Sequence, residues 1–450
     1  MATGIAPKAG VNRRILHAAT AVIAATLVVK VAAMVKEFAV AGIFGRSDAM
    51  DAFLVAFLIP NLLINLIAES MNQALVPTLI RVNIQEGHDR AQQLLSNSML
   101  SMCVLLAVAS LGMAALAHMF FPILGSNFEA GKLHLATQLF FALLPVVLIT
   151  GVASTCTAVL NTIDRFALPA LAPLAIPLSI LAGALLFHGR FGIWALVYAT
   201  LFGAVIHAGL VAWMMDASGF RLRLNWYGAS ESAREVSRQY GPILLSSVVA
   251  SGGLLVDQAM AAMLPAGSVS ALVFGNRFVS VVVTLLAGAV STAIVPYFST
   301  MIAHGDWQSC RRTLHTWSRL TLLASVPIAG LLIAGARPLV RMTLQHGVFG
   351  PSDTRVVTAV LAMYAIQIPF FVVSRVFYRF LVAMRRTDLI LYCGVLNLLL
   401  DVSLNLILMR WLGVAGIALA TSFWSMSTLL FLWYWSRRLL SFKLVEAECL

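Results

Sequence analysis

Residues 49–80 read AMDAFLVAFLIPNLLINLIAESMNQALVPTLI, an almost continuous apolar run in which Asp51 and Glu69 are the only acidic or basic side chains. The run exceeds the roughly 20 helical residues needed to cross a hydrocarbon core of about 30 Å. A membrane β-strand would alternate polar and apolar residues over about ten positions. Lipid permits no third spanning structure, because every backbone group must find its hydrogen bond within the protein. The stretch therefore predicts a membrane-spanning helix.

Similar apolar runs recur along the whole chain, from about Leu16–Phe44 to Leu412–Trp435, and we count about twelve of them. Hydrophobic residues make up 60% of the 450 residues and charged residues 11%, whereas about a quarter of a soluble domain is charged. No segment between the runs is long enough for a separate soluble domain. The sequence predicts an all-α polytopic membrane protein with about twelve transmembrane helices.

An internal repeat suggests how these helices are grouped. The motif NQALVP at 72–77 returns as STAIVP at 291–296, and the segment 192–200 resembles 413–421 in its glycines and its final Ala-Thr. We expect two pseudo-symmetric six-helix bundles around a central cavity. Their expected bounds are residues 1–215 and 236–450, joined by a cytoplasmic linker at 216–235.

The formal net charge of +12 is explained by topology and does not require a nucleic-acid partner. Basic side chains concentrate on alternate loops, as at Arg221, Arg223, Arg234 and Arg238. This asymmetry is typical of cytoplasmic loops. It predicts a multi-pass protein of the bacterial inner membrane with both termini in the cytoplasm.

Catalytic and nucleotide-binding motifs are missing. The chain contains no P-loop, no GxSxG and no HExxH, and its histidines lack ligand-like spacing. These patterns are the usual marks of phosphate, acyl-transfer and zinc chemistry. We therefore expect a transporter and not an enzyme, with no cofactor and no metal.

Ionisable side chains inside the apolar runs are the functional candidates, because such groups usually face a protein interior or a water-filled cavity. If the basic ones converge, they form a cationic cavity able to neutralise a diphosphate. Structural ion pairing or snorkelling is the alternative, which we favour for Arg319, Arg379 and Asp401. Asp51 equally fits a cap of its own helix. The expected substrate-binding residues are Lys30, Lys36, Asp51, Glu69, Arg277 and Arg375, and the expected ion-coupling residues are Asp257 and Asp51.

Several of these residues fall within motifs of a known family. The pattern Lys30-x-x-Ala33-x-x-Lys36-Glu37 resembles the N-terminal signature of the MurJ (MviN) lipid II flippases, and the same signature continues in Asp51-Ala52-Phe53, Pro60-Asn61-Leu62-Leu63 and Gln73-Ala74-x-Val76-Pro77. A later segment, Gly267-Ser268-Val269-Ser270-Ala271-Leu272 with Asn276-Arg277, resembles the entry to that family's eighth helix.

The resemblance implies a V-shaped twelve-helix core that moves undecaprenyl-diphosphate-linked sugars to the periplasmic face by alternating access. It places Lys30 and Lys36 at positions of functional arginines. It also matches Asp51, Arg277 and Arg375 to charged positions of the family.

Departures from the family pattern leave the substrate open. Ile64-Asn65 stands where a basic pair is expected, Ser280 replaces an acidic residue, and the usual thirteenth and fourteenth helices are absent. We expect a polyprenyl-diphosphate-linked saccharide, either an exopolysaccharide repeat unit or lipid II, as the partner within the lipid bilayer. The alternatives are a cation-coupled exporter of amphiphilic drugs and a non-transporting scaffold that binds envelope-synthesis proteins.

Overall fold

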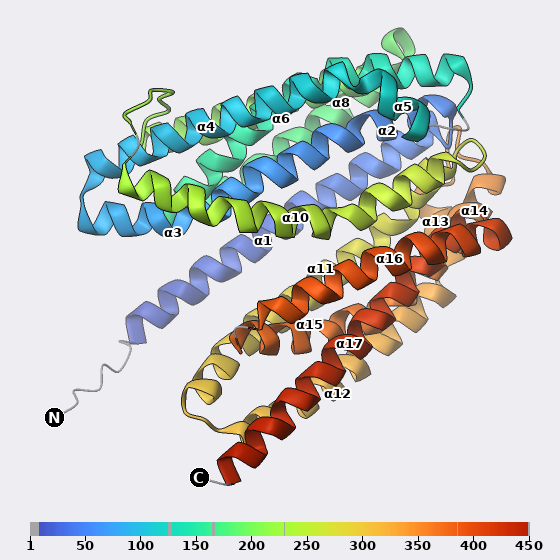
Figure 1. Ribbon diagram of the computed structural model, residues 1–450. Helices are drawn as coiled ribbons and strands as arrows, with labels where there is room; N and C mark the ends of the chain where they lie inside the picture. The colour runs from blue at the N-terminus through green and yellow to red at the C-terminus, as the bar shows by residue number, and fades with distance from the viewer. Residues whose placement is uncertain (1–8, 125–127, 164–166, 229, 385, 449–450) are drawn as a thin grey trace. The chain divides into compact units, whose positions relative to one another are not determined.

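The computed structural model describes residues 9–124, 128–163, 167–228, 230–384 and 386–448, and their regular structure is entirely helical (Figure 1). The all-α prediction is confirmed. The first half of the chain contains α1 (Ala9–Phe44), α2 (Asp48–Leu63), the π-helix η1 (Ile64–Glu69), α3 (Ser70–Gln85), α4 (His88–Ala115), α5 (Ala117–Leu124), α6 (Ala130–Thr162), α7 (Ala167–Leu171), the 3₁₀-helix η2 (Ala172–Leu174), α8 (Ala175–Phe191) and α9 (Trp194–Asp216). The second half contains α10 (Glu231–Ala262), α11 (Ser268–Ala303), α12 (Trp307–Ala334), α13 (Ala336–Leu344), α14 (Pro351–Ala365), α15 (Gln367–Ala383), α16 (Thr387–Leu412) and α17 (Val414–Glu448).

Eleven helical segments in the described part of the chain are long and apolar enough to cross a membrane. The run quoted above is one of them, because α2, η1 and α3 continue into each other as a 38-residue segment, Asp48–Gln85. The helix α1 adds a further 36 residues. The eleven segments and α1 together agree with the expected number of about twelve helices.

The chain forms two compact units that do not follow a single cut in the sequence. The first unit consists of Met1–Ile43, Ala56–Phe120 and His134–Val248, and the second of Phe44–Val55, Phe121–Leu133 and Val249–Leu450. The helices α2 and α10 therefore each contribute to both units. The division into bundles at 1–215 and 236–450 stays a prediction.

Small residues allow close helix packing in the first unit, where α8 lies against α9. A Cβ atom added to Gly183 would lie 2.5 Å from the Cβ of Ala199. One added to Gly203 would lie 2.8 Å from the Cα of Ile176. Membrane helices depend on such contacts because lipid supplies no hydrophobic force between them.

Aromatic pairs fill the core of the second unit, in which α11 packs on α14 and α15, and α17 packs on α15 and α16. The rings of Phe298 and Phe380 meet edge to face with centroids 5.6 Å apart. Phe274 and Phe349 do the same at 6.2 Å. This geometry is a favoured one for aromatic rings.

One pair of the repeated segments folds in the same way in both places. Gly192 ends α8 with φ 54°, and Gly413 ends α16 with φ 57°. In the helices that follow, Thr200 and Thr421 each donate to the carbonyl four residues earlier. Glycine is required at both junctions because other residues rarely adopt this positive φ. Most side chains of the 291–296 motif lie outside the described residues.

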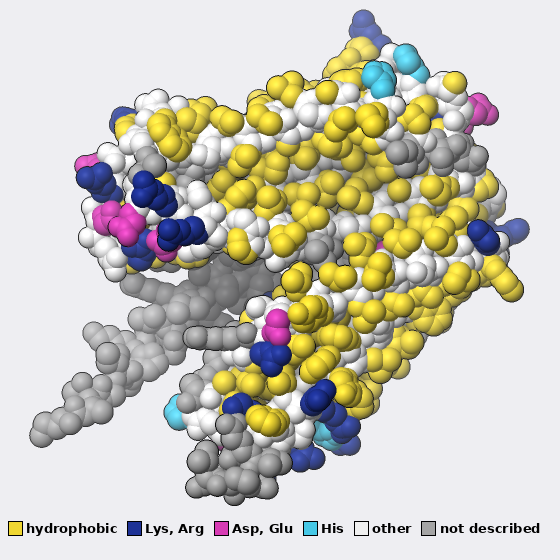
Figure 2. Space-filling model, in the orientation of Figure 1, with side chains coloured by type: hydrophobic (Ala, Val, Ile, Leu, Met, Phe, Trp, Pro, Cys, Tyr) yellow, Lys and Arg dark blue, Asp and Glu magenta, His cyan; other side chains and the backbone are white. Residues whose placement is uncertain are grey.

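On the face seen in Figure 2, hydrophobic side chains cover the long sides of the helices, whereas charged side chains gather toward the helix ends. Exposed apolar residues among those that the structure describes include Val108, Leu111, Phe202 and Leu323. A patch of this size on a soluble protein would be an aggregation hazard. It fits a protein whose sides face lipid.

Candidate functional site

The Asp51 cluster joins the start of α2 to the start of α11 within the second unit. The Asp51 carboxylate is 1% exposed and accepts from the backbone N–H groups of Gly267 at 2.7 Å and Ser270 at 2.8 Å. Lys132 Nζ lies 3.2 Å from Asp51 Oδ2 and 2.6 Å from Asp48 Oδ1. The carboxylate thus satisfies two of the unpaired amides at the N-terminus of α11, where a negative charge is favoured.

This arrangement differs from the expected cap of the helix that contains Asp51. The first turn of α2 is capped by Ser47, whose hydroxyl accepts from Met50 N at 3.3 Å. The Asp51 side chain is left for α11, 216 residues away in the sequence. Arg46 closes the other side of the junction, donating to the Gly267 carbonyl at 2.8 Å and pairing with Asp353 at 3.3 Å.

The Asp257 cluster is a set of oxygen-rich side chains buried between α10, α16 and α17. Asn405 Nδ2 donates to Asp257 Oδ1 at 2.8 Å and lies 3.5 Å from Asp401 Oδ1, and Thr421 Oγ1 lies 3.3 Å from Asp257 Oδ2. All four side chains are at most 7% exposed. Asp401 Oδ2 and Asn405 Oδ1 are buried without a hydrogen-bond partner.

The chemistry of this cluster calls for a positive charge. Among the described residues no lysine, arginine or histidine pairs with Asp257 or Asp401. Two buried carboxylates without a counter-charge are costly, since each pays a desolvation penalty of several kcal/mol. Carboxylate, amide and hydroxyl oxygens are also the ligands that hard cations prefer. The residues present therefore fit either a shared proton or a small hard cation.

Asp401 was expected to be structural, and Asn405 and Thr421 were not among the candidates. One sequence signal pointed to two of them, because Asp401 and Asn405 are four residues apart in an apolar run and so lie on one face of a helix. The partner face on α10 is not visible in the sequence.

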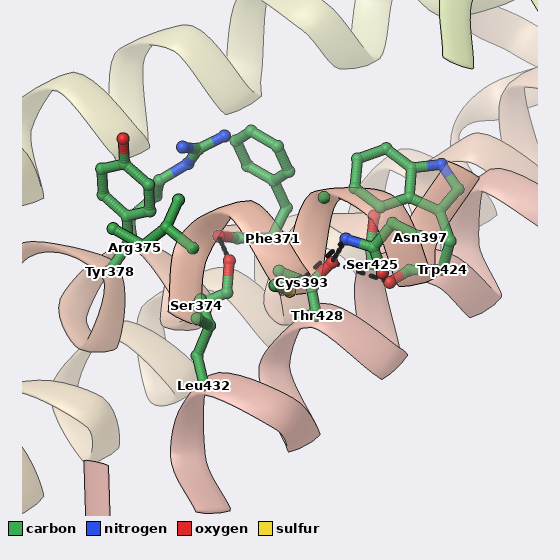
Figure 3. Close-up of a pocket in the computed structure, with 12 residues that line it drawn as sticks. Phe371, Ser374, Arg375, Tyr378, Cys393, Asn397, Trp424, Ser425, Thr428 and Leu432 are labelled. Carbon is green, nitrogen blue, oxygen red and sulfur yellow. Dashed lines mark hydrogen bonds between the residues drawn. The ribbon is translucent and has the colours of Figure 1, made fainter. Parts of the chain in front are cut away.

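The Arg375 pocket is a cavity of about 150 Å³ between α15, α16 and α17 (Figure 3). The Arg375 guanidinium lies over the rings of Phe371, at 4.2 Å, and Tyr378, at 5.5 Å. No carboxylate pairs with it among the described residues. On the other side of the pocket lie Asn397 and Trp424 (Figure 3). This pocket combines a cation with amide, hydroxyl and aromatic groups.

Glu69 belongs to a hydrogen-bonded chain in the first unit. It accepts from Ser154 Oγ at 2.8 Å, Ser154 accepts from Asn72 at 2.6 Å, and Asn72 accepts from Thr155 at 2.9 Å. Glu69 is the last residue of the π-helix η1. Short π-helical segments occur frequently at functional sites.

The remaining predicted site residues lie on the helices as expected. Lys36 pairs with its neighbour Glu37 at 2.7 Å, whereas the Lys30 side chain on α1 is exposed. Arg277 is exposed on α11. Lys30 and Lys36 belong to the first unit, and Arg277 and Arg375 to the second. Their convergence on one cationic cavity stays a prediction.

Comparison with known proteins identifies the family to which the chain belongs. The model of the family described as lipid II flippase MurJ matches residues 40–447. The chain belongs to the MurJ family. Members of this family are membrane transporters, so the protein is a multi-pass inner-membrane transporter and not an enzyme.

Individual relatives are distant but cover most of the chain. The lipid II flippase MurJ of Burkholderia cenocepacia is 28% identical over 355 residues, which are 76% of this chain and 68% of the relative. The probable lipid II flippase MurJ of Buchnera aphidicola is 24% identical over 428 residues, covering 94% of this chain and 83% of the relative.

Two solved structures show the same fold. A structure of lipid II flippase MurJ in an inward closed conformation aligns with a TM-score of 0.80 at 21% identity, covering 92% of this chain and 86% of that one. An inward-facing multidrug resistance transporter of the MATE family aligns with a TM-score of 0.75 at 13% identity, covering 94% and 98%. The MurJ-family chain therefore shares its fold with both of these transporters.

Proposed function

We propose that this MurJ-family flippase carries an undecaprenyl-diphosphate-linked saccharide, either lipid II or an exopolysaccharide repeat unit, from the cytoplasmic to the periplasmic leaflet by alternating access. The observation that carries the proposal is the family match over residues 40–447. Relatives named lipid II flippase support the class of substrate. The basic loops 221–238 support an orientation with both termini in the cytoplasm.

Cationic side chains within spanning helices support the transport of a diphosphate. Lys30, Arg277 and Arg375 lie on α1, α11 and α15, well inside their helices. A charge in such a position costs several kcal/mol unless a polar surrounding or a ligand compensates it. A diphosphate would do so, with arginine giving two parallel hydrogen bonds and lysine a point charge.

In this proposal the Asp257 cluster is the site at which transport is coupled to an ion gradient. In our proposal a proton or a small hard cation neutralises Asp257 and Asp401 in one conformation and leaves in the other. The support is the two buried, unpartnered oxygens at Asp401 and Asn405. A bound charge shifts a conformational equilibrium only by its difference in affinity for the two states. Two carboxylates that are buried in one conformation and solvated in the other would provide such a difference.

The Asp51 cluster would act as a fixed point during the change. The helix α2 contributes residues up to Val55 to the second unit and the residues from Ala56 onward to the first. The Asp51 bonds to Gly267 and Ser270 tie the start of α2 to α11. Substrate contact or ion coupling by Asp51 stays a prediction, as does substrate contact by Glu69 and Lys36.

Complementation tests the function. A strain depleted of its own lipid II flippase would express the wild-type chain, Arg277→Ala or Arg410→Ala, with membrane levels of each protein measured. Arg410 is a matched control because it is an exposed arginine at the end of α16. We expect wild type and Arg410→Ala to restore growth and Arg277→Ala to fail at equal expression.

Other outcomes separate the alternatives. Failure of well-expressed wild type, combined with loss of a surface polysaccharide when the gene is deleted, would assign an exopolysaccharide unit in place of lipid II. A non-transporting scaffold predicts no rescue by the wild-type chain, together with a deletion phenotype that every charge variant restores. A drug exporter predicts that resistance depends on Asp257 and is indifferent to Arg277.

A further inference from the structure

The Arg375 pocket contains polar groups that have no hydrogen-bond partner. The Arg375 guanidinium lies over the rings of Phe371 and Tyr378 and forms no hydrogen bond or ion pair with the residues that the structure describes. The faces of aromatic rings attract the guanidinium charge, but they do not accept strong hydrogen bonds from its N–H groups. Its donors are therefore available to an anion that enters the pocket.

Asn397 contributes a hydrogen-bond acceptor that has no partner. Its Nδ2 donates to Thr428 Oγ1 at 2.8 Å, and the Thr428 hydroxyl donates in turn to the Trp424 carbonyl at 2.9 Å. Because the Thr428 hydrogen is used, the group facing it must be a donor, and this fixes the orientation of the Asn397 amide. The Asn397 Oδ1 atom is then left buried with no partner.

A ligand donor satisfies this acceptor better than an empty pocket does. A buried polar atom without a hydrogen bond costs about 1–3 kcal/mol. Hydroxyls of Ser374 and Ser425 also line the pocket, and their own protons go to the Phe371 carbonyl and to the Thr421 carbonyl. Their oxygens therefore keep acceptor capacity for a ligand with several donors.

The aromatic side chains and the volume define the shape of that ligand. The indole of Trp424 is only partly buried and stands opposite the Arg375 side of the pocket (Figure 3). The cavity of about 150 Å³ is smaller than the roughly 300 Å³ at which pockets for whole drug-sized ligands begin. It accommodates one group of a larger molecule, with one apolar face, several donors and a neighbouring negative charge.

A sugar ring attached to a phosphate has this combination of features. We propose that the Arg375 pocket binds the sugar next to the diphosphate, with Trp424 against the ring face, Asn397 Oδ1 accepting from a hydroxyl or acetamido N–H, and Arg375 on the adjoining phosphate. This inference rests on the proposed function and adds to it a subsite that reads the first sugar. The pocket is formed within the second unit by α15, α16 and α17.

Equilibrium binding to the purified full-length chain in lipid nanodiscs tests the subsite. The two probes are undecaprenyl diphosphate and the same lipid carrying a single N-acetylhexosamine. We expect wild type to bind the sugar-bearing probe about tenfold more tightly, the value of one or two hydrogen bonds to a buried acceptor. Asn397→Leu should remove most of that preference and leave the affinity for undecaprenyl diphosphate unchanged, whereas Arg375→Gln should weaken both probes.

The bare diphosphate serves as the folding control for each variant, and Asn225→Leu removes an exposed amide between α9 and α10 as a matched control. Equal affinity of wild type and Asn397→Leu for the sugar-bearing probe would overturn the subsite while the proposed function stands. An equal loss on both probes in Asn397→Leu would also overturn it. If wild type binds neither probe, the proposed function fails, and the subsite fails with it.

Discussion

Asp51→Asn is the substitution with the clearest expected consequence, because it changes one atom of a buried carboxylate whose two oxygens have different partners. Asp51 Oδ2 accepts from Gly267 N and faces Lys132, and Oδ1 accepts from Ser270 N. Asparagine keeps one acceptor and places an NH₂ group where the other was. One backbone N–H of α11 then loses its partner whichever way the amide is turned.

The size of the effect follows from these contacts. A buried donor left unsatisfied costs about 1–3 kcal/mol. Loss of a negative charge at a partly buried helix N-terminus adds about 0.5–2 kcal/mol. We therefore expect Asp51→Asn to lower the free energy of unfolding by about 3 kcal/mol, which corresponds to a fall of roughly 6–12 °C in Tm for a unit of about 200 residues.

Asp48→Asn is the matched control. The Asp48 side chain pairs with the same Lys132 at 2.6 Å but is 62% exposed and touches no amide of α11. Exposed ion pairs contribute about 0–1 kcal/mol. Thermal unfolding of the purified proteins in one detergent compares the two. Equal falls in Tm, or a fall below about 2 °C for Asp51→Asn, would refute the reasoning that α11 depends on this carboxylate.

Two further predictions concern charge and packing. Asp257→Asn should weaken the dependence of thermal stability on pH and on added small cations, since it removes one of the two buried carboxylates; an unchanged dependence in the variant would exclude the Asp257 cluster as the coupling site. Gly183→Ala should destabilise the first unit by about 1–3 kcal/mol because its Cβ would meet Ala199, whereas Gly189→Ala, with open space around it, should not, as thermal unfolding will show.

The fold and the positions of the charges were predictable, because both are written in single segments of sequence. Apolar length decides that a run spans the membrane, and an ionisable residue inside it is visible without any structure. The glycines at 192 and 413 were likewise visible as a repeat, although the sequence was interpreted as starting a helix at each and the structure has each ending one in the same conformation.

The hydrogen-bond and ion-pair partners of those charged side chains were less predictable, because they depend on which sides of two helices pack together. Substrate contact and ion coupling by Asp51 stay predictions, whereas its bonds to the start of α11, in place of a cap on its own helix, were not visible in the sequence. Asp401 was interpreted as structural, although it lies beside Asp257 with one oxygen unpartnered. Lys36 pairs with the adjacent Glu37, which the sequence did permit.

The helices α16 and α17 each contribute to two polar sites, and this arrangement bears on how transport could be driven. Asn397 of the Arg375 pocket and Asn405 of the Asp257 cluster are eight residues apart on α16, and Thr428 and Thr421 are seven residues apart on α17. Seven residues are close to two turns, about 10.5 Å along one helix face. A change in the packing of α16 against α17 therefore alters both sites together.

Thermodynamic linkage requires that any coupling between the two sites be reciprocal. If a cation at the Asp257 cluster changes the affinity of the Arg375 pocket by some factor, the occupied pocket must change the affinity for the cation by the same factor. Binding of the sugar-bearing lipid measured with and without the cation, and of the cation with and without the lipid, has to give one number. Two different factors would mean that the shared helices do not couple the sites and that the driving force acts elsewhere.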